Sequence, residues 1–180
     1  MQLHFFASSG TSTAGIGAGG GQPAGSYQSS AYTWGGSTWT TITSVPGGGY
    51  EAGNMFGTQT AAISIGGASP PSNKVLTLSG STWSSETAVP ITGPNGTGNG
   101  VGAQDSAVYG QGTSVASWNG SSWTAEPNFP VGKPSRAATG GTQTGFFAAG
   151  GTPGGTPTPS ARQTVEFTGA GPATQTVTVS

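Results

Sequence analysis

Short apolar runs bordered by glycines recur along the chain. Four eleven-residue segments align without gaps, and each begins and ends with glycine, at residues 10–20, 57–67, 102–112 and 141–151. Their starting points are 47, 45 and 39 residues apart. A chain rich in Gly, Ser and Thr is disordered unless its apolar residues recur in register, so this repeat indicates a folded protein.

A second pattern follows three of these segments. An alternating stretch leads into a two-residue turn and then to a tryptophan, at residues 32–39, 76–83 and 116–123. The turn pairs are Gly-Gly, Ser-Gly and Asn-Gly, and Asn-Gly in particular is typical of a β-hairpin. The fourth repeat keeps an alternating stretch near residues 165–169 but has no tryptophan there. No stretch shows the helical period, so each unit is predicted to be an antiparallel sheet of about four short strands.

The predicted fold class is therefore all-β, with one domain, residues 1–180, made of four repeats. The approximate bounds of the repeats are residues 2–45, 46–88, 89–127 and 128–180. One such sheet cannot bury both of its faces alone, so we expect each sheet to pack against the next, as in propellers and stacked arrays. The predicted structural residues are glycine pairs that end apolar runs and tryptophans that fill the space between sheets: Gly66, Gly67, Gly150, Gly151, Trp39, Trp83 and Trp123.

The two ends of the chain carry further strand candidates, at residues 3–7 and 176–179. If these strands pair with each other, they close the four sheets into a small ring and remove two exposed strand edges. The alternatives are an open array and a ring completed by another chain.

Composition excludes several functional classes. The chain has four Lys and Arg, five Asp and Glu, and a net charge of −1. Only 5% of its residues are charged, against about 25% in an ordinary domain. This balance predicts neither a nucleic-acid surface nor a polybasic membrane patch. The chain has no run of 18 apolar residues, and residues 1–6 lack the features of a signal peptide, so no membrane insertion is expected.

The residues that could perform catalysis or bind metal are few. There is no cysteine and a single histidine, His4, so we predict no catalytic, metal or cofactor site. The five acidic residues are spread over the repeats, and a polysaccharide-cleaving enzyme would need two of them, such as Glu126 and Glu166, in one cleft. That alternative is the least favoured, and solvated loop positions are the simpler interpretation.

Aromatic residues outside the repeat pattern are the candidates for a ligand-binding surface. They are Tyr27, Tyr50, Tyr109 and Phe129. Rings of this kind stack on sugars, while the Ser, Thr and Asn side chains around them supply hydrogen bonds. The long loops at residues 22–30, 90–101 and 152–161 are further places for recognition.

The repeat resembles the kelch-type β-propeller repeat. The residues that carry this resemblance are Gly-Thr-Gln-Thr-Ala-Ala at 57–62, the following Gly-Gly, and Asn-Gly-Ser-Ser-Trp-Thr at 119–124. More narrowly, they look like the kelch-like repeats of bacteriophage virion proteins, especially tail-fibre and other surface-exposed structural proteins. Kelch propellers usually have more blades than the four units of this chain.

The resemblance implies a non-enzymatic structural protein on the virion surface, as a tail-fibre or capsid-decoration component that serves host attachment. Its expected partners are other virion proteins, further copies of itself as a homo-oligomer, and host cell-surface glycan. Its expected location is the virion or the extracellular space. The alternative is a subunit of an extracellular filament or a bacterial adhesin, for which the same composition is suitable.

Overall fold

The computed structural model describes residues 7–21, 26–47, 52–67, 73–91, 98–129, 138–149 and 164–168. In these residues the chain forms four small antiparallel sheets and no helix, as the sequence predicts. In each sheet the strands lie side by side in chain order, and short turns or longer loops connect them. This local connectivity follows from the short spacing between the alternating runs.

The first sheet consists of β1 (Ala7–Gly10), β2 (Gly15–Ala18), β3 (Ala31–Trp34) and β4 (Trp39–Ile42). The second consists of β5 (Ala52–Thr58), β6 (Ala61–Gly67), β7 (Val75–Ser79) and β8 (Thr82–Ser85). The third consists of β9 (Asn99–Ala103), β10 (Ser106–Gln111), β11 (Ser114–Trp118) and β12 (Trp123–Glu126). The fourth consists, in the described residues, of β13 (Ala138–Thr142), β14 (Gly145–Ala149) and β15 (Thr164–Thr168).

The glycine that begins each repeat makes the tight turn between the first two strands of its sheet possible. Gly57, for example, has φ of 110°, and a Cβ atom at this position would collide with the carbonyl oxygen of Ala61. Gly66 and Gly67, which end the apolar run of β6, also have positive φ, at 78° and 131°. Only glycine adopts such angles readily, which explains the spacing of glycines along the repeat. The corresponding pair 150–151 lies outside the described residues.

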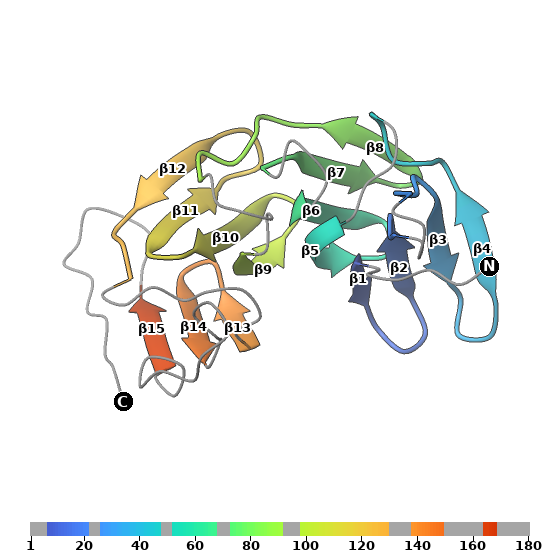
Figure 1. Cartoon of the computed structure of the whole chain (residues 1–180). Coiled ribbons are helices and arrows are strands. Elements are labelled where there is room, and N and C mark those ends of the chain that lie inside the picture. The colour runs from blue at the N-terminus through green and yellow to red at the C-terminus, as the bar shows by residue number, and fades with distance from the viewer. Residues whose placement is uncertain are drawn as a thin grey trace.

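The sheets follow one another along an open arc (Figure 1). The first strands of successive sheets pack together: β1 against β5, β5 against β9, and β9 against β13. These strands lie toward the concave side of the arc, and the first and fourth sheets form its two ends (Figure 1). The predicted closing strands, residues 3–7 and 176–179, lie outside the described residues except for Ala7, which begins β1.

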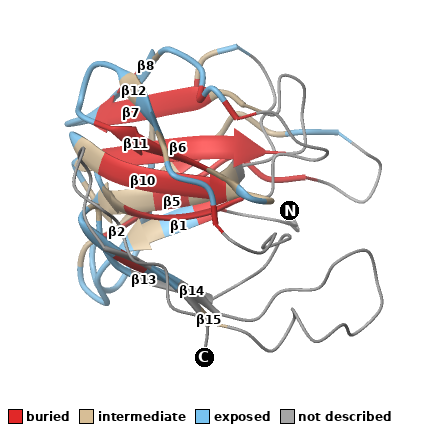
Figure 2. Ribbon diagram, turned by 90° about the vertical axis from the view of Figure 1, so that its left-hand side faces the viewer, coloured by how far each residue is buried: buried red, intermediate tan, exposed pale blue. Residues whose placement is uncertain are grey.

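Two hydrophobic cores fill the spaces between the first three sheets. The first joins Ile16 and Ala31 of the first sheet to Ala62 and Leu78 of the second. The second core joins aliphatic residues of the other face of the second sheet to aromatic and small residues of the third, namely Ile63, Ile65, Val75, Val89 and Ile91 with Ala107, Tyr109, Ala116 and Trp118. Buried residues are accordingly concentrated in β6, β7, β10 and β11 (Figure 2). Sheet-on-sheet packing therefore provides burial that no single sheet could provide.

The repeated tryptophans do not share one environment. Trp83 is 6% exposed and belongs to the first core, and Trp123 is partly buried against the second core. Trp39, which the sequence pattern also predicts to fill a space between sheets, is 54% exposed. That prediction is wrong for Trp39 because its ring lies on the side of the first sheet that points away from the second.

Candidate interaction surface

Two of the four aromatic residues predicted to form a ligand surface are buried. Tyr109 is 1% exposed, and its hydroxyl oxygen accepts a 2.8 Å hydrogen bond from the backbone N–H of Gly98. Burial raises the pKa of Tyr109 to about 12, although the hydrogen bond from Gly98 opposes part of that shift. Phe129 is 3% exposed and stacks on Phe146 with the ring centroids 5.8 Å apart. Neither ring is available to a surface ligand, so both predictions are corrected.

The other two candidates have different outcomes. Tyr27 forms an isolated antiparallel β-bridge with Gly21. Its side chain is 39% exposed, so its ring is accessible. Tyr50 lies outside the described residues. Among the described residues, one predicted surface aromatic, Tyr27, is therefore exposed.

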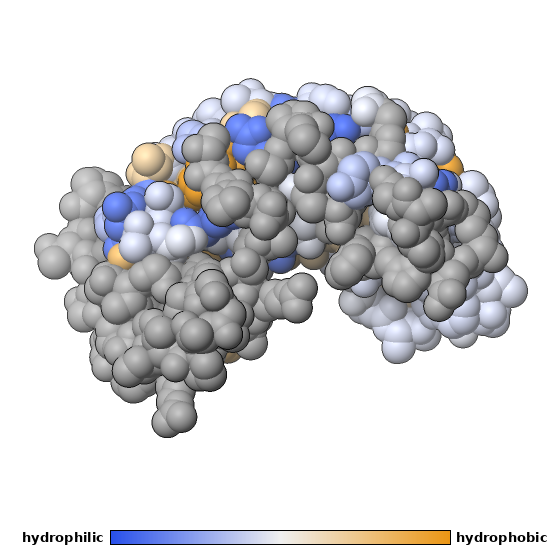
Figure 3. Space-filling model, in the orientation of Figure 1, coloured by the Kyte–Doolittle hydropathy of each residue, from blue (hydrophilic) through white to orange (hydrophobic). Residues whose placement is uncertain are grey.

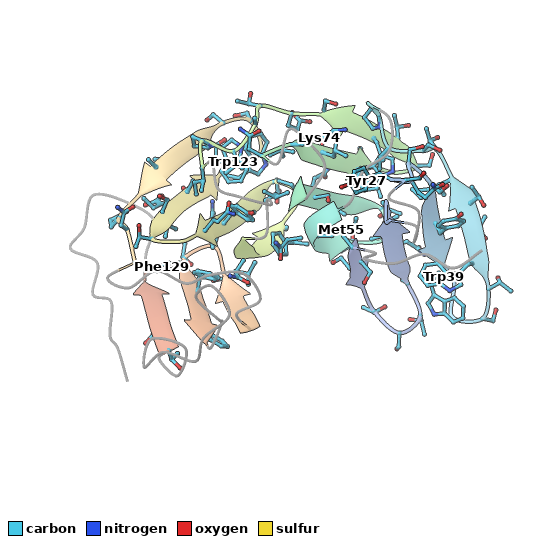
Figure 4. The ribbon with its side chains drawn as sticks, viewed as in Figure 1. Tyr27, Trp39, Met55, Lys74, Trp123 and Phe129 are labelled. Carbon is cyan, nitrogen blue, oxygen red and sulfur yellow. The ribbon has the colours of Figure 1, made fainter. Side chains whose placement is uncertain are left out.

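The largest exposed aromatic surface comes instead from a pair of tryptophans. Trp34 and Trp39 are directly opposite each other on β3 and β4, with ring centroids 5.4 Å apart and planes tilted by 45°. The Nε1–H of Trp34 donates a 2.9 Å hydrogen bond to the carbonyl oxygen of Ser12, which fixes the position of its ring. Trp39 lies at the outer end of the arc in Figure 4, whereas Trp123 lies within it.

The third sheet contains the same pair in a covered position. Trp118 and Trp123 have centroids 5.2 Å apart and planes tilted by 44°. The Nε1–H of Trp118 donates to the carbonyl oxygen of Gln104, which occupies the repeat position of Ser12. Trp123 also donates a 3.0 Å bond to the carbonyl oxygen of Thr87, which follows β8 of the preceding sheet. In the third sheet the tryptophan pair therefore contacts the preceding part of the chain.

An open groove of about 500 Å³ lies beside the exposed pair. Its lining residues come from β1, β2, β3 and β4 and from the β1–β2 turn: Ser8, Ser9, Gly10, Thr11, Gly15, Ile16, Trp34 and Trp39. None of them is charged. Gly10 and Gly15 are paired across β1 and β2, and they contribute only backbone to the floor of the groove. The groove thus offers aromatic rings, hydroxyl groups and exposed backbone.

The surface around the groove carries few charged or strongly polar residues. In the space-filling view the described surface is mostly pale, as expected for Ser, Thr and Gly, and the concave side of the arc is open between its two ends (Figure 3). No helix in the described part of the chain is long and apolar enough to cross a membrane. The surface therefore offers hydroxyl groups, backbone and a few aromatic rings to a binding partner.

The carboxylates of two sheets have structural hydrogen-bond partners. Glu86 accepts a 2.6 Å bond from the hydroxyl of Thr77, and Glu126 accepts a 2.5 Å bond from the hydroxyl of Ser117. These are equivalent positions of the second and third repeats, so each carboxylate joins the last two strands of its own sheet. Among the described residues, no three His, Cys, Asp or Glu side chains form a group that could hold a metal ion.

Glutamines in the first turn of three repeats link neighbouring sheets. Gln59, Gln104 and Gln143 occupy equivalent positions, and each donates from Nε2 to a backbone carbonyl oxygen of the preceding sheet. The acceptors are Trp34 at 2.7 Å, Leu78 at 2.6 Å and Trp118 at 2.6 Å, which are also equivalent positions. These glutamines therefore have a packing role that the sequence analysis missed. The signal was the recurrence of Gln itself.

The sequence matches no protein-family model and no curated protein. The function of this surface must therefore be argued from its residues and its geometry.

Proposed function

We propose that this protein is a non-enzymatic structural protein of a virion surface, a tail-fibre or decoration component built as a kelch-like, propeller-like array. The observation that carries the proposal is the repeated link between sheets. In each of Gln59, Gln104 and Gln143, the side-chain Nε2 donates a hydrogen bond to the backbone carbonyl oxygen at the equivalent position of the preceding sheet. A chain whose recurring polar residues join its sheets together is suited to mechanical and assembly roles. The resemblance of its repeat to those of bacteriophage virion proteins supports the more specific assignment.

The use of the carboxylates also favours a structural role over catalysis. A glycosidase needs two carboxyl groups on either side of a bound sugar, within about 5–10 Å of each other. Glu86 and Glu126 each accept a hydrogen bond from a hydroxyl of their own sheet, at equivalent positions of successive repeats. Repetition of this arrangement in consecutive sheets is expected for residues that stabilise a sheet.

Antibody labelling of whole particles tests the location. Antibodies raised against the chain, applied to virus particles purified from the source material and viewed by electron microscopy, are expected to mark the tail or the capsid surface. Label restricted to cell-surface filaments would refute the virion assignment and support the filament alternative.

A depolymerisation assay tests the absence of catalysis. The wild-type chain is expected to leave bacterial polysaccharides intact, as is the variant Glu126→Gln. Cleavage by the wild-type chain that Glu126→Gln abolishes would refute the non-enzymatic role.

A further inference from the structure

The two faces of each sheet contact different neighbours. In β6, Ala62 belongs to the core shared with the first sheet, whereas the next residue, Ile63, belongs to the core shared with the third. We call the face toward the preceding sheet the front face and the face toward the following sheet the back face. Successive residues of a strand alternate between the two. Since the eleven-residue segments align without gaps, this assignment extends to the equivalent positions of all four sheets.

A front face and a back face remain exposed at the ends of the arc. The front face of the first sheet carries Trp34 and Trp39, and Trp39 is 54% exposed. The back face of the fourth sheet carries Phe147, which is 43% exposed and aligns with Ile16 and Ile63, both 0% exposed. Residues that fill junctions inside the arc are therefore accessible at its ends, where they extend the established interfaces.

The sizes of these end residues are complementary. The back-face position that holds Ile or Val in the first three repeats holds the larger Phe147 in the fourth. The equivalent front-face position holds Ala62 and Ala107 in the second and third repeats, and in the first repeat it holds Gly15, whose backbone forms the floor of the groove. The larger side chain at one end thus corresponds to the smaller residue at the other.

An internal junction already contains an aromatic ring packed on glycine. Phe56 of β5 lies against Gly100 of β9, and a Cβ atom on Gly100 would lie 2.9 Å from Cζ of Phe56. A phenyl ring placed over the glycine floor of the groove would repeat this kind of contact between copies. The exposed Glu166, opposite Phe147 on β15, would meet no like charge, because none of the groove residues is charged.

We propose that the front face of the first sheet of one molecule binds the back face of the fourth sheet of a second copy, with Phe147 seated in the groove beside Trp34 and Trp39. The contact joins two different surfaces, so it is head-to-tail. Two molecules close into a ring when both contacts form, and the same contact continued from molecule to molecule gives a filament. The occupant is a second copy because the two ends of one chain lie apart along the arc (Figure 1). This inference does not depend on where the protein is located.

Single substitutions at the two ends test the contact by sedimentation analysis. The wild-type chain is expected to associate reversibly, and Trp39→Ser and Phe147→Ser are each expected to weaken association about 30-fold, which corresponds to about 2 kcal/mol for a central aromatic. Tyr27→Ser removes an aromatic ring of similar exposure that does not line the groove, and it is the matched control. Far-ultraviolet circular dichroism and thermal unfolding should be unchanged in all three variants, since these side chains are exposed.

Mixing the two variants distinguishes a head-to-tail contact from a symmetric one. The Trp39→Ser chain retains a native back face, and the Phe147→Ser chain retains a native front face, so an equimolar mixture is expected to form heterodimers that neither variant forms alone. If the groove instead paired with itself, Phe147→Ser would associate like the wild-type chain, and this result would overturn the proposal. A wild-type chain that stays monomeric up to about 100 μM would also overturn it. The proposal would also be overturned by a monomeric wild-type chain that binds sugars on a glycan array, if Trp39→Ser abolishes this binding. The groove would then be a carbohydrate site.

Discussion

Replacing Tyr109 with Phe tests a buried polar contact inside the third repeat, between β10 and the residue that precedes β9. The substitution keeps the ring in its core and removes the hydroxyl oxygen that accepts a hydrogen bond from the backbone N–H of Gly98. Gly98 is itself buried, so its N–H loses its phenol partner away from water. An unpaired buried donor costs about 1–3 kcal/mol, and we expect this loss in the free energy of unfolding at neutral pH.

The same hydroxyl makes the stability depend on pH in the alkaline range. The pKa of Tyr109 is about 12 in the folded chain, because burial disfavours the phenolate, and about 10 in an unfolded chain. Below about pH 10 the phenol is protonated in both states and has no effect on the pH dependence. Between about pH 10 and about pH 12 only the unfolded state loses the proton, so the stability contributed by this group is lost as pH rises. A shift of about two units corresponds to about 3 kcal/mol.

Urea unfolding followed by tryptophan fluorescence measures both effects. Wild-type stability is expected to fall by about 3 kcal/mol more than that of Tyr109→Phe across this alkaline range. Tyr27→Phe, which removes an exposed hydroxyl, should match the wild-type stability at neutral pH. Equal pH dependence in wild type and Tyr109→Phe would show that the phenol is solvated. Equal stability of these two proteins at neutral pH would show that the bond to Gly98 is not formed.

Two further substitutions test the junctions between sheets by the same unfolding assay. Gln104→Met removes the donor to a carbonyl of the preceding sheet and is expected to cost about 1 kcal/mol, whereas Ser12→Gln, at the equivalent position with no preceding sheet among the described residues, should be neutral. A neutral Gln104→Met would show that the glutamines do not hold the sheets together. Gly100→Ala places a methyl group 2.5 Å from the carbonyl oxygen of Val108 and 2.9 Å from the ring of Phe56, and it should cost about 1–3 kcal/mol. Gly35→Ala, where the added Cβ meets nothing within 4 Å, is its control, and equal stability of the two variants would contradict the close packing around Gly100.

The repeat predicted the sheets because their formation depends on local signals. The turn glycines, exemplified by Gly57 with φ of 110°, fix the position of each hairpin, and the alternating runs fix which residues pair. These signals act over a few residues, so they can be recognised in one sequence. The curvature of the array depends on long-range packing that no local pattern encodes.

The aromatic residues show why absence of repetition was a poor guide to exposure. Tyr109 was predicted to be at the surface because the other repeats have Gly17, Ser64 and Ala148 at its position. In the structure it points into the same core as Ala107, two residues earlier on β10, and Gly98 provides the room for its ring. A large residue at one position was compensated by a small residue on the neighbouring segment. A single sequence does not reveal this compensation, because the two residues lie far apart in the pattern.

Trp39 illustrates a different limit of prediction from the sequence. Equivalent positions of a repeat have the same backbone conformation, but they do not all have the same neighbouring sheet. Trp83 and Trp123 are buried or partly buried because a sheet precedes theirs, whereas Trp39 belongs to the first sheet of the arc.

The position of the first sheet at the end of the arc also affects the strength of the contact proposed between copies. The first repeat has Ser12 where the others have a glutamine, so a junction formed by its front face lacks the hydrogen bond that joins every sheet pair inside the arc. That junction would depend on aromatic packing alone, and it should therefore dissociate on dilution while the internal junctions remain intact.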